Sequence, residues 1–238
     1  LTHLLQISFI LFIWGLIHLF SLNWGLPNPE CFAIDTMPSE LDMTPYNMML
    51  RNNFQYPPLQ YLFAGQICHP KYDSRDISDP NLISLRSDKI FKTRLLSALM
   101  SLGTAIIIYF SARILFKDSS MPALIAPLLF LLNPLSIYYS NTSNMDQPYT
   151  FWWTFSYMLI IIAEIKSRNK IILFLIYQIA SGITFALAFC TKDQVYSLYF
   201  LPLIVYLLLK WKNTKSLRLP LIVLFSWFIS FFVTTAII

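Results

Sequence analysis

Long apolar runs alternate with short polar connections along most of the chain. A membrane-spanning helix needs about 20 mostly apolar residues, and seven runs come close to or reach this length. The runs are residues 4–22, 90–116, 121–139, 149–165, 171–189, 195–209 and 219–238. They predict an all-α fold, a polytopic transmembrane helical bundle with a long extracytoplasmic loop, residues 23–89, after the first helix. Pro127 is expected to kink the third span at mid-depth, which membrane helices tolerate.

The basic residues fall on the connections that alternating spans place on one side of the membrane. After the second, fourth and sixth spans these residues are Arg113 and Lys117, then Lys166, Arg168 and Lys170, then Lys210, Lys212, Lys215 and Arg218. The short connections on the other side, residues 140–148 and 191–194, carry only Lys192. Short cytoplasmic connections are enriched in Lys and Arg. We therefore expect the first terminus and the basic connections in the cytoplasm, and residues 23–89 outside.

Composition supports a membrane protein and excludes other classes. The chain is 56% hydrophobic and 12% charged, whereas an average soluble domain is about a quarter charged. An aromatic content of 16% excludes a disordered chain. The net charge of +5 does not indicate a nucleic-acid partner, because the basic residues punctuate apolar runs. Since the sequence opens on Leu1 and stops inside an apolar run at Ile238, we expect the N-terminal part of one transmembrane domain whose C-terminal region is missing.

Acidic residues gather at three places on the predicted outer side. Glu30 and Asp35 follow the first span, Asp146 precedes the fourth and Asp193 precedes the sixth. Charged groups near membrane depth are costly and are therefore candidates for function. Carboxylates on one face can bind a divalent ion, or one of them can act as a general base. The simpler alternative is a solvated loop residue, and Asp146 could also cap the helix ahead of Pro148.

Four sequence features follow one another in a fixed order against the predicted spans. Gly25-Leu-Pro-Asn-Pro-Glu-Cys-Phe-Ala-Ile-Asp35 follows the first span, and Phe54-Gln-Tyr-Pro-Pro-Leu59 lies in the same loop. Arg94-Leu-Leu-Ser-Ala-Leu99 opens the second span. Leu132-Asn-Pro-Leu-Ser-Ile-Tyr-Tyr-Ser140 precedes Asp146, and Lys192-Asp-Gln194 comes further on. This arrangement resembles the GT-C class of glycosyltransferases that use polyprenyl-phosphate sugars, especially the protein O-mannosyltransferase and aminoarabinose-transferase-like branch.

The resemblance implies an inverting hexosyl- or pentosyltransferase in the plasma or ER membrane, with its active site on the extracytoplasmic side. It would move a sugar from a polyprenyl-phosphate donor to a glycan, lipid or protein acceptor. Glu30 or Asp35 would be the catalytic base, Asp146 would orient a metal or the headgroup, and Arg94 and Lys192 would bind phosphate. The metal would be Mg²⁺ or Mn²⁺. Tyrosines suited to line the substrate are Tyr56, Tyr61, Tyr138 and Tyr139, and the alternative for them is the interfacial aromatic belt.

One departure from the family keeps other interpretations open. The family's Pro-Asp-Glu motif reads Pro29-Glu30-Cys31 here, which leaves open whether Glu30 or Asp35 is the base and admits a catalytically inactive relative in a membrane complex. A transporter or flippase subunit is the other alternative, although the predicted spans hold almost no ionisable residue at mid-depth. Cys31 and Cys68 share the outer loop, so they could form a disulfide, with two unpaired thiols as the alternative.

Overall fold

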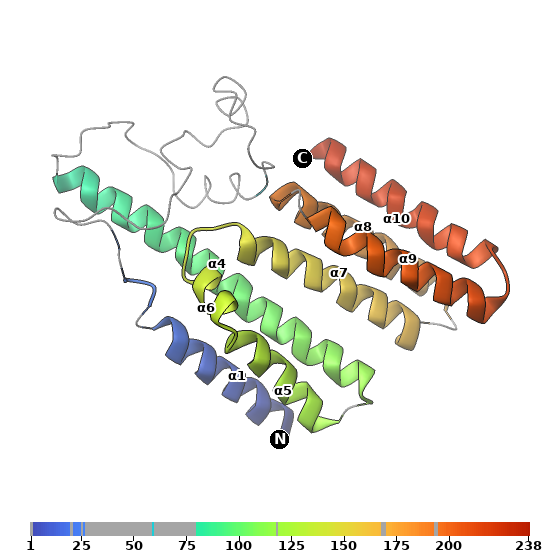
Figure 1. The fold of residues 1–238 in the computed structure, drawn as a ribbon, viewed down its shortest axis with the longest axis horizontal. Coiled ribbons are helices and arrows are strands. Elements are labelled where there is room, and N and C mark those ends of the chain that lie inside the picture. Colours follow the sequence, from blue (N-terminus) through green and yellow to red (C-terminus); the bar gives the residue numbers. More distant parts are fainter. Residues whose placement is uncertain are drawn as a thin grey trace.

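The computed structural model of the chain is an assembly of α-helices. It describes residues 2–19, 21–24, 26, 59, 80–117, 119–167, 170–192 and 195–238. Within these ranges every regular element is a helix (Figure 1). The helices are α1 (Thr2–His18), α4 (Pro80–Leu115), α5 (Ser120–Leu131), α6 (Pro134–Ser140), α7 (Asp146–Lys166), α8 (Ile171–Thr191), α9 (Val195–Thr214) and α10 (Arg218–Ile237). The predicted all-α helical bundle is confirmed.

Each apolar run of the sequence corresponds to one helix, except the third, which is divided. Helices α5 and α6 meet at an angle of 62°. The helix α5 continues through Pro127, so the break lies further along the chain than the expected kink. At the break, Asn133 caps α6, because its side-chain oxygen accepts a hydrogen bond of 2.9 Å from the Leu135 backbone N–H. Pro134 follows as the first residue of α6, a position that suits proline.

Three helical segments of the described residues are long and apolar enough to cross a membrane, namely Ile90–Leu115, Ile171–Thr191 and Arg218–Ile237. The bent pair α5–α6 makes a fourth if it counts as one span. The sequence pattern predicted seven spans. Helix α1 is apolar but shorter. Helices α7 and α9 are helical as predicted but are not among these three segments. The outer surface is nevertheless apolar, since Leu129, Ile172 and Ile237 are each more than two thirds exposed, as lipid-facing side chains are.

The centre of the bundle combines aromatic packing with a small polar network. Helix α7 packs along α8 and α4, and α8 packs along α10. Between α7, α8 and α9 the Ser156 hydroxyl lies 2.8 Å from the Ser181 hydroxyl and 2.8 Å from the Tyr199 hydroxyl. Around it pack Phe185 and Trp227, both fully buried. Hydroxyls buried in an apolar bundle hydrogen-bond to groups on neighbouring helices, because no water is available as a partner, and they thereby link the helices.

The connections of the bundle lie at two opposite ends. Figure 1 shows the α4–α5, α7–α8 and α9–α10 connections at one end and the α6–α7 and α8–α9 connections at the other. The first, which we call the basic end, carries Arg113, Lys117, Lys166, Lys170, Lys210, Lys212, Lys215 and Arg218. The second, which we call the Asp146 end, carries Asp146 and Lys192. The alternation on which the topology prediction depends is therefore present in the fold.

Candidate functional site

The Asp146 end holds an ion pair between two of the predicted site residues. The Lys192 ammonium nitrogen lies 2.6 Å from Asp146 Oδ1, and each side chain is 14% exposed. Asp146 stands in the first turn of α7, whose N-cap is Met145, so Asp146 is not the helix cap considered from the sequence. Lys192 is the C-cap of α8. An acid at a helix N-terminus and a base at a helix C-terminus both interact favourably with the helix dipoles, and the pair therefore joins two helix ends of compatible sign.

An aromatic ring further fixes the position of Lys192. Its ammonium lies 5.5 Å from the centroid of the Tyr149 ring, a distance at which a cation is attracted to the ring face. Tyr149 is one turn along α7 from Asp146, so one helix supplies both contacts. An ammonium held in this way, and still partly exposed, is suited to donate a hydrogen bond to an additional anionic oxygen.

A second polar cluster attaches the end of α1 to the α6–α7 connection. The Asn141 side-chain oxygen lies 2.7 Å from His18 Nδ1 and accepts a hydrogen bond of 2.7 Å from the Ser21 hydroxyl. Its amide nitrogen donates to the Ile137 carbonyl at 2.8 Å. His18 is only 2% exposed. Because Asn141 lies five residues before Asp146, this cluster places the start of the outer loop beside the connection that leads to the ion pair.

Arg94 lies in α4 and is 2% exposed. Its Nη1 atom donates hydrogen bonds to the backbone carbonyls of Leu22 at 3.0 Å and Trp24 at 2.6 Å. These contacts hold the chain that leaves α1. Glu30 follows six positions after Trp24 in the sequence.

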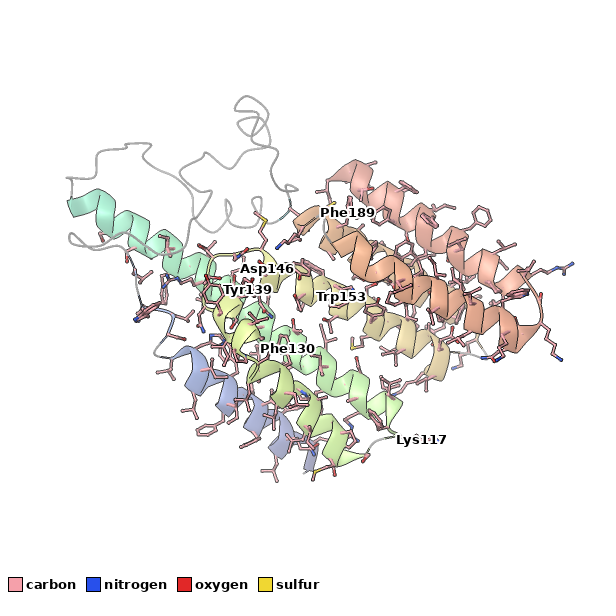
Figure 2. The ribbon with its side chains drawn as sticks, viewed as in Figure 1. Lys117, Phe130, Tyr139, Asp146, Trp153 and Phe189 are labelled. Carbon is pink, nitrogen blue, oxygen red and sulfur yellow. The ribbon has the colours of Figure 1, made fainter. Side chains whose placement is uncertain are left out.

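The predicted tyrosines and acids divide into described and undescribed positions. Tyr138 and Tyr139 lie on α6, with ring centroids 5.2 Å apart in an edge-to-face pair, and Tyr138 is 57% exposed. Figure 2 shows Tyr139 and Asp146 at the same end of the bundle. The remaining predicted positions lie outside the described residues: Glu30, Asp35, Tyr56, Tyr61, Asp193 and the Cys31–Cys68 pair. The predicted convergence of Glu30 and Asp35 with Asp146 therefore stays a prediction.

The fit of a divalent metal rests on one described carboxylate. Among the described residues, no three His, Cys, Asp or Glu side chains gather as a metal site. The Asp146 carboxylate instead faces an ammonium group. Divalent metals of the Mg²⁺ and Mn²⁺ type prefer several oxygen ligands. The predicted ion at Asp146 thus depends on further carboxylates such as Glu30 and Asp35, and the described part of the site does not by itself fit it.

Sequence reasoning did not single out His18, Asn141 or Gln147 at this end. His18 was visible as a titratable residue at the end of the first apolar run, and Asn141 as part of the polar connection. Gln147 lies next to Asp146, is 2% exposed, and its amide nitrogen has no hydrogen-bond partner within the described part of the chain. The sequence does not reveal this burial, because it depends on how α7 packs in the bundle.

Comparison with models of protein families matches residues 82–238 to the family described as dolichyl-phosphate-mannose-protein mannosyltransferase. The chain belongs to this mannosyltransferase family. The matched range contains Arg94, Asp146 and Lys192, whereas Glu30 and Asp35 precede it. No curated protein and no solved structure was found to match the chain.

Membership of the mannosyltransferase family confirms the GT-C resemblance. It identifies the chain as a membrane glycosyltransferase of the type that uses polyprenyl-phosphate sugar donors. Together with the apolar helices, it also identifies an integral membrane protein. The Asp146–Lys192 pair is therefore a charged site in a family whose donor carries a phosphate.

Proposed function

We propose that the chain transfers a sugar from a polyprenyl-phosphate donor to an acceptor hydroxyl at the Asp146 end, on the extracytoplasmic face. The observation that carries the proposal is the partly exposed ion pair between Asp146 and Lys192 at 2.6 Å. A lipid-linked donor is anchored in the bilayer, so its phosphate arrives at a helix end and not in the middle of a span. Lys192 is positioned at such an end.

Lys192 binds the phosphate that leaves the sugar. The acceptor oxygen attacks the anomeric carbon while the bond from that carbon to the phosphate oxygen breaks, through a transition state with oxocarbenium character. The electron pair of the broken bond stays on the phosphate, whose added negative charge the Lys192 ammonium stabilises. The acceptor proton goes to Glu30 or Asp35. A single displacement of this kind inverts the anomeric configuration, as expected of an inverting hexosyl- or pentosyltransferase.

Asp146 keeps the Lys192 ammonium in place before the donor binds. Its carboxylate offsets the cost of holding a mostly buried ammonium, and the first turn of α7 in turn favours a carboxylate. The same carboxylate can orient the donor headgroup, or a Mg²⁺ or Mn²⁺ ion if Glu30 or Asp35 provides further ligands. In both cases neutralising Asp146 removes the charge that organises the site.

Arg94 has a second role beside the predicted phosphate contact. Its hydrogen bonds to the carbonyls of Leu22 and Trp24 support a positioning role, in which it fixes the origin of the chain that carries Glu30 and Asp35. We therefore assign phosphate binding first to Lys192 and treat Arg94 mainly as a positioning residue. Tyr138 and Tyr139, together with Tyr56 and Tyr61, are proposed to line the path of the sugar or the isoprenoid chain.

The test uses purified protein in lipid vesicles with a serine- and threonine-containing peptide as the acceptor, and measures release of polyprenyl phosphate from radiolabelled polyprenyl-phosphate mannose. Removing one group that stabilises transition-state charge lowers the rate about 100-fold to 1,000-fold. The release rates of Asp146→Asn and of Lys192→Gln are therefore each expected to fall by about 100-fold or more. The matched control is the exposed pair Asp88–Lys92, also 2.6 Å apart but on the surface of α4. Asp88→Asn and Lys92→Gln should release polyprenyl phosphate at the normal rate.

Separate substitution of the two candidate bases completes the experiment. The transfer rates of Glu30→Gln and Asp35→Asn are expected to differ, because only one of the two acids takes the acceptor proton and its loss slows transfer more. Transfer at the normal rate by Lys192→Gln, with its folding intact, would contradict the proposed role of the ion pair. Absence of any release by the unaltered protein would favour the catalytically inactive relative.

A further inference from the structure

A pocket unrelated to the Asp146 end lies among the helix ends of the basic end. Its volume is about 270 Å³. Four helices contribute to its wall: α7, α8, α9 and α10. The residues that line it are Glu164, Ile171, Phe174, Tyr206, Leu209, Lys210, Asn213, Thr214 and Leu219. We call it the basic pocket. Part of its wall is aromatic or aliphatic, and the rest is polar or charged.

The central cation of the basic pocket is Lys210, whose side chain is 9% exposed. Its ammonium pairs with the Glu164 carboxylate, lies 4.3 Å from the centroid of the Phe174 ring and 5.6 Å from that of Tyr206. The Tyr206 hydroxyl donates to the same carboxylate and accepts a hydrogen bond of 2.9 Å from the Gln178 amide. Lys210 is thus fixed in the wall by contacts from α7, α8 and α9.

Positive charge around the basic pocket exceeds negative charge. Five exposed cations lie on the helix ends and connections that adjoin it in the sequence, although none of them lines the pocket, namely Lys166, Lys170, Lys212, Lys215 and Arg218. In the described part of α7 to α10 and their connections, the acidic residue at this end is Glu164, and Lys210 already neutralises it. Helix α8 also begins at the pocket, with no side-chain cap and no acid in its first turn. Unpaired N–H groups at a helix start favour an anion.

We propose that the basic pocket binds the phosphate headgroup of an anionic membrane lipid. The phosphate would lie near Lys210 and the exposed cations, and the start of the acyl chains would lie along Ile171 and Leu209, which are each 54% exposed. A soluble phosphate compound has no apolar part that could contact Ile171 and Leu209, whereas a lipid has acyl chains. Basic pockets between the membrane-side ends of helices are a known setting for acidic lipid headgroups. The proposal is independent of the sugar-transfer site.

The test measures lipid binding to the purified protein in neutral detergent by native mass spectrometry, with phosphatidylglycerol and phosphatidylcholine as probes. Several cations near one headgroup predict that phosphatidylglycerol binds roughly tenfold more tightly. The double variant Glu164→Gln/Lys210→Gln removes the buried cation without changing the net charge, and should lose most of this preference. A second double variant, Lys212→Gln/Lys215→Gln, changes two exposed residues and should weaken phosphatidylglycerol binding as well. It tests the proposal if Glu164→Gln/Lys210→Gln does not fold.

The matched control is Lys117→Gln, on the α4–α5 connection of the same end (Figure 2). It lowers the net charge but leaves the basic pocket intact, so its preference for phosphatidylglycerol should remain. Equal binding of both lipids by the unaltered protein would overturn the proposal. So would a loss in Lys117→Gln as large as in the pocket variants, which would mean general attraction to a positive surface. Displacement of phosphatidylglycerol by inorganic phosphate alone would identify a free-phosphate site and overturn the lipid assignment.

Discussion

Asn141 shows how one side chain can organise the approach to a site without reaching it. It accepts hydrogen bonds near the end of α1 and donates one to its own helix turn. The partner His18 is 2% exposed, so losing Asn141 would leave a buried polar ring without its described partner. Buried polar groups that lose their partners cost much more than the average hydrogen bond contributes.

Asn141→Leu is therefore expected to lower the free energy of unfolding by about 1–3 kcal/mol, measured as a drop in melting temperature in detergent. The control is Asn144→Leu in the same connection, where the exposed side chain accepts, among the described residues, a hydrogen bond from the neighbouring Met145 N–H. Similar melting temperatures for the two variants would show that the Asn141 cluster does not anchor α1.

At the scale of the element, two glycines of helices test how closely the helices pack. A Cβ atom on Gly182 of α8 would overlap the Ser230 hydroxyl and lie 2.7 Å from the Trp227 carbonyl of α10. Since the second atom is backbone, α10 itself would have to move. A Cβ atom on Gly15 of α1 would meet nothing within 4 Å.

Gly182→Ala should destabilise the bundle by about 1–3 kcal/mol, the usual cost of overpacking. Gly15→Ala should leave stability unchanged or raise it by up to about 1 kcal/mol, because alanine favours helix. Melting temperatures of both variants in the same detergent make the comparison. A Gly182→Ala protein as stable as the unaltered one would mean that α8 and α10 separate at little cost.

Helix boundaries show where sequence patterns suffice and where they do not. The apolar runs located the described helices, with α5 and α6 taken as one, because the apolar side chains of each helix pack in the bundle or face lipid. The break between α5 and α6 was missed because the expected bend in this run was placed at Pro127, near its middle. A proline inside a membrane helix is tolerated, whereas a capping Asn133 followed by proline begins a new helix.

The candidate site was also only partly accessible from the sequence. Parity of the spans and their polar ends singled out Asp146 and Lys192 as residues of one face. Their pairing depends on α7 packing along α8, over a separation of 46 residues, which no local pattern encodes. The same holds for Lys210, which the sequence presents only as a charge that sets topology, and for Arg94, whose carbonyl partners lie 70 and 72 residues away.

On the scale of the whole molecule, the two ends of the bundle should face opposite sides of the membrane. Thiols introduced at the exposed positions Asn144 and Ser216, in a background without the native cysteines, distinguish the ends. An impermeant maleimide applied to the extracytoplasmic side should label Asn144→Cys and leave Ser216→Cys unlabelled, because Lys and Arg keep the basic end in the cytoplasm. It should likewise label thiols within residues 23–89 and miss those within 166–170.

Labelling of Ser216→Cys from outside would reverse the topology and place the proposed transfer site in the cytoplasm. Labelling of both positions after the membrane is made permeable controls for accessibility. The assay depends on neither catalysis nor lipid binding, so its outcome separates the topology from both proposals.

Helix α4 is longer than the bilayer requires. Its 36 residues give a length of about 54 Å at 1.5 Å per residue, whereas the hydrocarbon core is about 30 Å thick. The apolar part begins at Ile90, so the ten residues of α4 that precede it extend about 15 Å further. Because this part of α4 is a rigid helix, its length fixes both how far its first residue lies from the membrane and the direction around the helix axis in which that residue faces. Removing seven residues from it would lower its tip by about 10.5 Å with little rotation, whereas removing two would turn the tip by about 200°. The direction in which the chain enters α4 at Pro80 is therefore set by the helical repeat.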